Sequence, residues 1–138
     1  MEALNIDQVV IEGVDKTGKD SIMKYIDTLG KHKYALYQRG HISNVVYARI
    51  FDREEHKYTL NPHSLYVLLT ADPEDLDIRF KLTNEPYTDI KRDLNMFDKV
   101  FKEMTAEAGV HTLIINTTDI TLYNAAKLIL DTCESLNK

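Results

Sequence analysis

Apolar residues recur along the chain with two spacings, one typical of strands and one of amphipathic helices. Short apolar runs at residues 7–11, 33–38, 65–69 and 111–116 predict strands, and the last two are continuous enough to be buried on both faces. Apolar residues three or four apart predict helices at residues 19–29, 43–53, 73–83, 90–108 and 121–136. This alternation predicts an α/β fold. We expect one domain over residues 1–138, a three-layer sandwich with a short, mainly parallel sheet between helices.

Several residues mark where the predicted helices begin and end. Gly30 and Gly109 follow the first and fourth helical patterns and predict their ends. Ser43 is expected to cap the second helix, and Asp72 the third, with Pro73 in the first turn. The polar stretch at residues 54–63 is expected to be a loop.

The first predicted strand leads into a glycine-rich segment, residues 13–20, which we call the phosphate loop. Gly13, Gly18 and Lys19 match the pattern Gly-x-x-x-x-Gly-Lys-[Ser/Thr], whereas Asp20 stands where the hydroxyl residue is expected. Backbone N–H groups of such a loop surround a phosphate, and the positive end of the following helix faces the same anion. The segment therefore predicts nucleotide binding.

Composition and charge exclude several other classes of protein. The chain of 138 residues carries a formal net charge of −5 and has no Lys/Arg block, which argues against a nucleic-acid polymer as partner. Its one cysteine, Cys133, falls in the last helical pattern and is expected to be buried, and no internal disulfide can form. Without a long apolar run or a secretory signal, no membrane association and a cytoplasmic location are expected. The five histidines show no spacing typical of zinc ligands.

The phosphate loop resembles that of the thymidylate kinase and deoxynucleoside kinase families, which reads Glu-Gly-x-Asp-Gly-x-Gly-Lys-[Ser/Thr]. The residues at matching positions are Glu12, Gly13, Asp15, Gly18 and Lys19. Lys16 stands where these families usually have glycine. The acidic residues at positions 12 and 15 make this match more specific than a phosphate loop alone.

A second segment strengthens the resemblance. These families carry Asp-Arg-x-x-x-Ser-x-x-x-Tyr after a strand, and Arg39, Ser43 and Tyr47 keep that spacing here, with Gln38 in place of the aspartate. The strand, Asp-x-Pro and helix at residues 68–79 are similar to the segment that leads into the families' mobile lid, which would lie at about residues 81–92 and bring Lys81, Lys91 and Arg92 to the donor.

The resemblance implies a compact, phage-type P-loop nucleotide kinase. Such a protein binds ATP and Mg²⁺ and transfers a phosphoryl group to a deoxynucleoside or a dTMP-like deoxynucleoside monophosphate, and family members often form homodimers. The donor would bind at Gly13, Asp15, Lys16, Thr17, Gly18, Lys19, Asp20 and Ser21. The acceptor would bind at Arg39, Ser43 and Tyr47, and catalysis would fall to Lys19, Arg39 and the position of Gln38. Lys19 and Arg39 have the cationic groups that phosphate oxygens need.

Two departures from the family pattern leave the activity open. Asp20 can bind the metal directly, or it can satisfy the helix N-terminus and compete with phosphate; Ser21 is a second candidate metal ligand but faces about 100° round the helix. Gln38, expected at the other end of the site from Asp20, cannot act as a base. The alternative is therefore a degenerate kinase fold that binds a nucleotide or a protein partner without turnover. A regulatory GTP switch is less well supported, because residues 116–119 lack the lysine of its base-reading motif.

Overall fold

The sheet is parallel throughout and forms the middle layer of the molecule. The computed structural model describes residues 5–84 and 89–138. Its four strands are β1 (Gln8–Glu12), β2 (Ala35–Gln38), β3 (Ser64–Thr70) and β4 (His111–Asn116), in the order β2-β1-β3-β4. Every neighbouring pair is parallel, which confirms the predicted α/β class.

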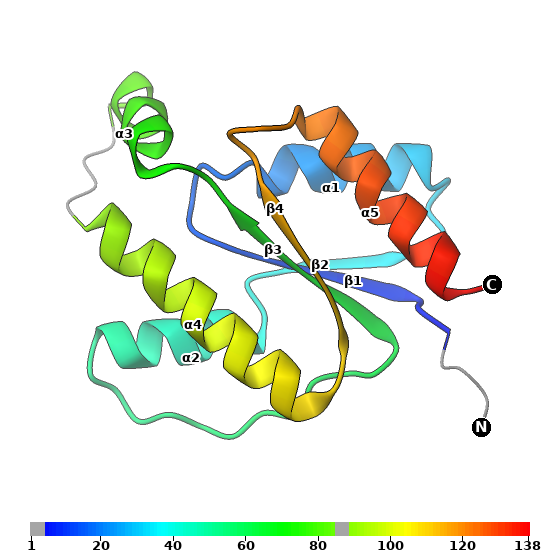
Figure 1. Cartoon of the computed structure of the whole chain (residues 1–138), viewed down its shortest axis with the longest axis horizontal. Helices are drawn as coiled ribbons and strands as arrows, with labels where there is room; N and C mark the ends of the chain where they lie inside the picture. Colours follow the sequence, from blue (N-terminus) through cyan, green and yellow to red (C-terminus); the bar gives the residue numbers. More distant parts are fainter. Residues whose placement is uncertain (1–4, 85–88) are drawn as a thin grey trace.

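Helices cover both faces of this sheet, as predicted. α1 (Lys19–Leu29) and α5 (Leu122–Leu136) pack together on one face, and α2 (His41–Ile50) and α4 (Ile90–Ala108) pack together on the other (Figure 1). α3 (Pro73–Leu82) follows the carboxyl end of β3 and packs against α4. Among the described residues, no helix has both the length and the apolar character needed to cross a membrane.

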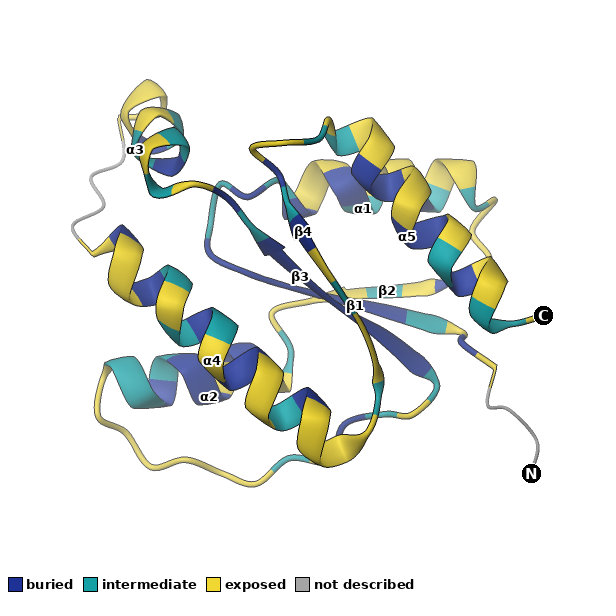
Figure 2. Cartoon of the chain, viewed as in Figure 1, coloured by how far each residue is buried: buried dark blue, intermediate teal, exposed yellow. Residues whose placement is uncertain are grey.

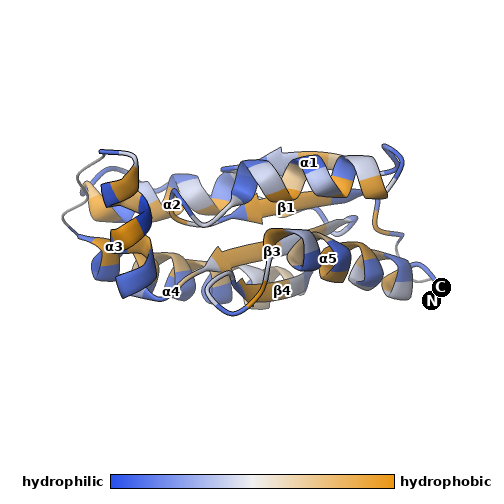
Figure 3. Cartoon of the chain, turned by 90° about the horizontal axis from the view of Figure 1, so that it is seen from above, coloured by the Kyte–Doolittle hydropathy of each residue, from blue (hydrophilic) through white to orange (hydrophobic). Residues whose placement is uncertain are grey.

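The central strands supply both halves of the core because their side chains alternate between the two faces. Val9 and Ile11 of β1 pack with the buried side chains of α1 and α5, whereas Val10 packs with those of α2 and α4. Strand β3 is buried on both faces from Ser64 to Leu69, as Figure 2 shows, and this confirms the prediction for residues 65–69. In Figure 3, β1 and β3 are drawn largely in hydrophobic colours, while the helices mix hydrophobic and hydrophilic positions.

Two predictions about local structure are wrong. Strand β4 was expected to be buried on both faces, but it lies at the sheet edge, where Ile115 is buried and Ile114 is 44% exposed. Ser43 does not cap α2: the helix begins at His41 with Gly40 at the capping position, so Ser43 lies within the first turn. Asp72 does occupy the capping position of α3, although its side chain makes no capping hydrogen bond.

Candidate functional site

The phosphate loop joins β1 to α1 at the carboxyl edge of the sheet, where ligands of open α/β folds bind. Two of its glycines are required, for different reasons. A Cβ at Gly13 would lie 2.5 Å from the backbone carbonyl oxygen of Leu69, which leaves no room for a side chain. Gly18 has φ of 102°, a conformation that other residues rarely adopt. Lys16 also adopts a left-handed backbone, with φ of 69°, a conformation that glycine takes at no steric cost.

Lys19 begins α1 and points back into the loop. Its side chain is 5% exposed, and its Nζ donates to the carbonyl oxygens of Gly13 at 2.7 Å and Val14 at 2.9 Å. Burial lowers the pKa of Lys19 to about 8, and the nearby Asp15 carboxylate opposes that shift. The loop therefore holds a desolvated ammonium group whose hydrogen-bond partners are neutral carbonyls, and a phosphate would be a stronger partner.

Glu12 connects the phosphate loop to the segment that follows β2. This side chain is fully buried at the end of β1. Its Oε1 accepts from the backbone N–H of Gly40 at 2.6 Å and its Oε2 from that of Ser43 at 2.6 Å, while the Ser43 hydroxyl donates to Oε1 at 3.2 Å. Burial raises the pKa of Glu12, and these hydrogen bonds oppose that rise. The resemblance singled out Glu12 without showing this role.

Two side-chain contacts cross from the end of β2 to the phosphate loop and α1. Gln38 Nε2 donates to Asp20 Oδ1 at 2.8 Å, and Arg39 pairs with the carboxylate of Asp15. Gln38 and Asp20 were expected at opposite ends of the site, and that expectation is wrong. The two residues that depart from the family pattern touch each other.

A cavity of about 320 Å³ lies at this junction. The residues that line it come from the phosphate loop, the first turn of α1 and the end of β2: Asp15, Lys16, Gly18, Lys19, Asp20, Ser21, Gln38 and Arg39. All of them were candidate site residues in the sequence. Thr17 of the loop is buried, and its hydroxyl donates to the Val14 carbonyl at 2.7 Å.

Ser43 and Tyr47 do not line this cavity. Ser43 is buried against Glu12, so the structure gives it a contact inside the protein. Tyr47 is half-buried, with its ring edge-to-face against Phe97 at a centroid distance of 5.8 Å. Burial raises the pKa of the Tyr47 hydroxyl. Ser43 is thus held by Glu12 of β1, and Tyr47 packs against Phe97 of α4.

The predicted lid falls partly on residues 85–88, which lie outside the described residues. On either side of them, two of the three candidate cations contact carboxylates close by in the sequence. Lys81 lies 2.7 Å from Asp77 on α3, and Arg92 lies 3.2 Å from Asp89 and 3.0 Å from Asp93 at the start of α4.

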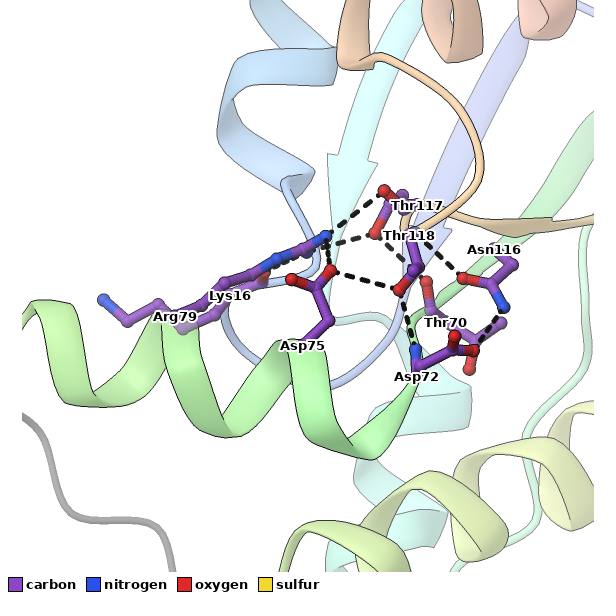
Figure 4. Close-up of polar contacts among 8 residues, drawn as sticks. All are labelled: Lys16, Thr70, Asp72, Asp75, Arg79, Asn116, Thr117 and Thr118. Atoms are coloured by element: carbon purple, nitrogen blue, oxygen red, sulfur yellow. Dashed lines mark hydrogen bonds and ion pairs between the residues drawn. The ribbon is translucent and has the colours of Figure 1, made fainter.

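Arg79 of α3 binds the phosphate loop from outside, a role that the sequence did not reveal (Figure 4). Its guanidinium donates to the carbonyl oxygen of Lys16 at 2.7 Å, to the hydroxyl and carbonyl oxygens of Thr117 at 3.2 Å each, and to the carboxylate of Asp75 at 2.5 Å. The available signal was the four-residue spacing of Asp75 and Arg79, which is common on solvated helices.

A second set of contacts in the same place ties α3 to the loop after β4. Asn116 Nδ2 donates to Asp72 at 3.0 Å, and the Thr118 hydroxyl accepts from the Asp72 backbone N–H at 2.9 Å and donates to Asp75 at 3.1 Å. Figure 4 shows these side chains converging between α3 and the two loops. The start of α3, the phosphate loop and the loop after β4 are therefore held together by polar contacts.

Comparison with known proteins identifies the fold. No protein-family model matches the chain, and no curated protein matches it in sequence. Among solved structures, the YorR protein of Bacillus subtilis, crystallised in complex with phosphorylated GDP, is similar with a TM-score of 0.65 over 92% of this chain and 95% of that one, at 19% sequence identity. The chain therefore shares the α/β fold of that protein.

Proposed function

We propose that the protein binds a nucleoside triphosphate in the phosphate loop and transfers its terminal phosphoryl group to a deoxynucleoside or a deoxynucleoside monophosphate. The observation that carries this proposal is the cavity in which Lys19, Arg39 and the N-terminus of α1 come together beside a glycine-constrained loop. The likeness to YorR, whose structure contains phosphorylated GDP, supports a nucleotide as the ligand.

Each side chain in the cavity has a part in this proposal. Lys19 exchanges its two carbonyl partners for oxygens of the donor phosphates, and the first N–H groups of α1 face the same anion. Arg39 leaves Asp15 to bind phosphate oxygens with its guanidinium, which matches their geometry. Phosphoryl transfer depends mainly on such positioning and charge neutralisation.

The residues of the cavity also fit a divalent cation that arrives with the nucleotide. No group of three or more His, Cys, Asp or Glu side chains that could hold a metal occurs in the described part of the chain. Mg²⁺ fits such a site because it is usually bound by one or two carboxylates together with substrate phosphates. Asp20 would be that carboxylate, with Ser21 beside it in the cavity lining. The cation would neutralise charge on the phosphate oxygens.

The second candidate function is a module that binds a nucleotide or a protein partner without turnover. It is favoured by Gln38, which lies where the related kinases have an aspartate and has no basic group to accept a proton. The Asp20 carboxylate, at the start of α1, is also a group that repels phosphate when no cation is present.

The two functions are separated by measuring ADP formation with Mg·ATP and a panel of deoxynucleosides and their monophosphates, together with the thermal stability of the protein with ATP. Turnover with at least one acceptor supports the kinase. A raised Tm with ATP but no turnover with any acceptor supports the binding module. If ATP does not stabilise the protein, or if Lys19→Ala leaves ATP binding unchanged, both nucleotide-binding proposals fail and only a module that binds a protein partner remains. Lys24→Ala, at an exposed position on α1, is the matched control.

A further inference from the structure

The contact between Asp20 and Gln38 joins α1 to the end of β2 at the cavity. Asp20 lies in the first turn of α1, and Gln38 is the last residue of β2, paired in register with Ile11 of β1. Both side chains are exposed, and the amide of Gln38 occupies one oxygen of the carboxylate, Oδ1. Among residues 5–84 and 89–138, no hydrogen bond or ion pair to Oδ2 is present, and both residues line the cavity.

The position of Gln38 is fixed by the main chain on both sides of it. β2 pairs with β1 up to this residue, and the Arg39 backbone N–H donates to the Ile11 carbonyl at 3.3 Å. Beyond it, the buried Glu12 holds the N–H groups of Gly40 and Ser43. The amide of Gln38 therefore extends from a constrained backbone, so its hydrogen bond can orient a flexible carboxylate on the facing helix.

We propose that Gln38 is a positioning residue: its amide holds the Asp20 carboxylate at the mouth of the phosphate loop, where that carboxylate binds the divalent cation of the bound nucleotide. The inference rests on the proposed nucleotide binding and adds a role that the kinase pattern does not contain. A carboxylate at position 20 and a hydrogen-bond donor at position 38 form one unit. Metal-binding carboxylates are commonly held in this way by a neighbouring donor.

Because Asp20 is negatively charged, its effect on ATP binding should reverse direction when Mg²⁺ is removed. With a cation present, the carboxylate attracts Mg·ATP; without one, it lies close to the phosphates and repels them. Asp20→Asn should therefore weaken ATP binding in Mg²⁺ and strengthen it in EDTA. Gln38→Met, which keeps the side-chain length and removes the donor, should weaken binding in Mg²⁺ but not in EDTA, where release of the carboxylate can only reduce its repulsion of the phosphates.

The test is calorimetry of ATP binding to the full chain, in Mg²⁺ and in EDTA, for the wild type, the two single variants and the double variant. The compared quantity is the factor by which Mg²⁺ raises the affinity for ATP over that in EDTA. We expect this factor to be about 10- to 100-fold smaller in each single variant than in the wild type. Because Gln38 acts through Asp20, Gln38→Met in the Asp20→Asn background should cost nothing more. Asp98→Asn, which removes a carboxylate paired with Lys102 on α4, controls for the change in net charge.

Three results would overturn the inference. They are an absence of any enhancement by Mg²⁺ in the wild type, an equal weakening of ATP binding by Gln38→Met in EDTA, and losses of the two variants that add in full. The second would mean that Gln38 contacts the nucleotide itself. A wild type that binds no ATP under either condition would instead refute the proposed function. Both positions are exposed, so thermal unfolding should show both variants folded.

Discussion

The buried ammonium of Lys19 gives the free protein a pH dependence that Lys19→Met should remove. The pKa of Lys19 is about 8 in the folded protein, against an ordinary value of 10.5. Between these values the unfolded chain holds a proton that the folded protein has lost, so the free energy of unfolding rises with pH. Below pH 8 both states hold the proton, and the full cost of burying the charge is present.

The size of this effect follows from the difference between the two pKa values. Folding lowers the pKa of Lys19 from 10.5 to about 8, and each pKa unit corresponds to about 1.4 kcal/mol. Burial of the charge therefore lowers the free energy of unfolding of the wild type by about 3 kcal/mol at pH 7. About 2 kcal/mol of this cost should be lost between pH 7 and about pH 9.5. The absolute stabilities at one pH are less informative, because methionine also loses the hydrogen bonds to Gly13 and Val14, each contributing about 1 kcal/mol.

The assay is urea unfolding at several pH values from 7 to about 9.5, with the same ionic strength throughout. The difference in unfolding free energy between wild type and Lys19→Met should change by about 2 kcal/mol in favour of the wild type as the pH rises. Lys24→Met, on the exposed side of the same helix, should follow the wild type. Parallel curves for wild type and Lys19→Met would contradict this prediction, because they would mean that folding does not change the pKa of Lys19.

Two further variants test the contacts that hold the site together. Glu12→Gln should lower the free energy of unfolding by about 1–3 kcal/mol in denaturant titrations, because its NH₂ group would face a buried N–H donor of Gly40 or Ser43; unchanged stability would contradict this. Arg79→Met should cost about 2 kcal/mol and weaken ATP binding, measured by calorimetry, because it removes the hydrogen bond from the guanidinium to the Lys16 carbonyl of the phosphate loop. The exposed Lys81→Met should change stability by less than about 0.5 kcal/mol, and an equal loss in both variants would argue against a specific role for Arg79.

The sequence was sufficient for features that depend on local pattern. The alternation of strands and helices gave the parallel sheet, and the continuous apolar run at residues 65–69 identified the strand that is buried on both faces. The glycines and lysine of the phosphate loop located the cavity, because a loop between the first strand and helix must lie at the carboxyl edge of a parallel sheet.

Features that depend on tertiary position could not be predicted in the same way. The run Leu113-Ile114-Ile115 is as apolar as a central strand, yet β4 lies at the sheet edge. The residues of a strand do not by themselves determine its place in the order of strands. Serine is a residue type that commonly caps helices, but the side chain of Ser43 donates to Glu12 instead. The contact between Asp20 and Gln38 joins residues 18 positions apart in the sequence, and only the packing of α1 beside β2 brings them together.

The way in which Glu12 holds the segment after β2 has a consequence for how this site can change during evolution. Its carboxylate binds the main-chain N–H groups of Gly40 and Ser43, which every residue type except proline possesses. The path of the chain through this turn is thus largely independent of the side chain at position 38, whereas position 39, with φ of 55°, also disfavours β-branched residues. Substitutions at position 38 can alter the chemistry at the mouth of the loop while the geometry is inherited unchanged, and proline at position 40 or 43 is a replacement that this arrangement excludes.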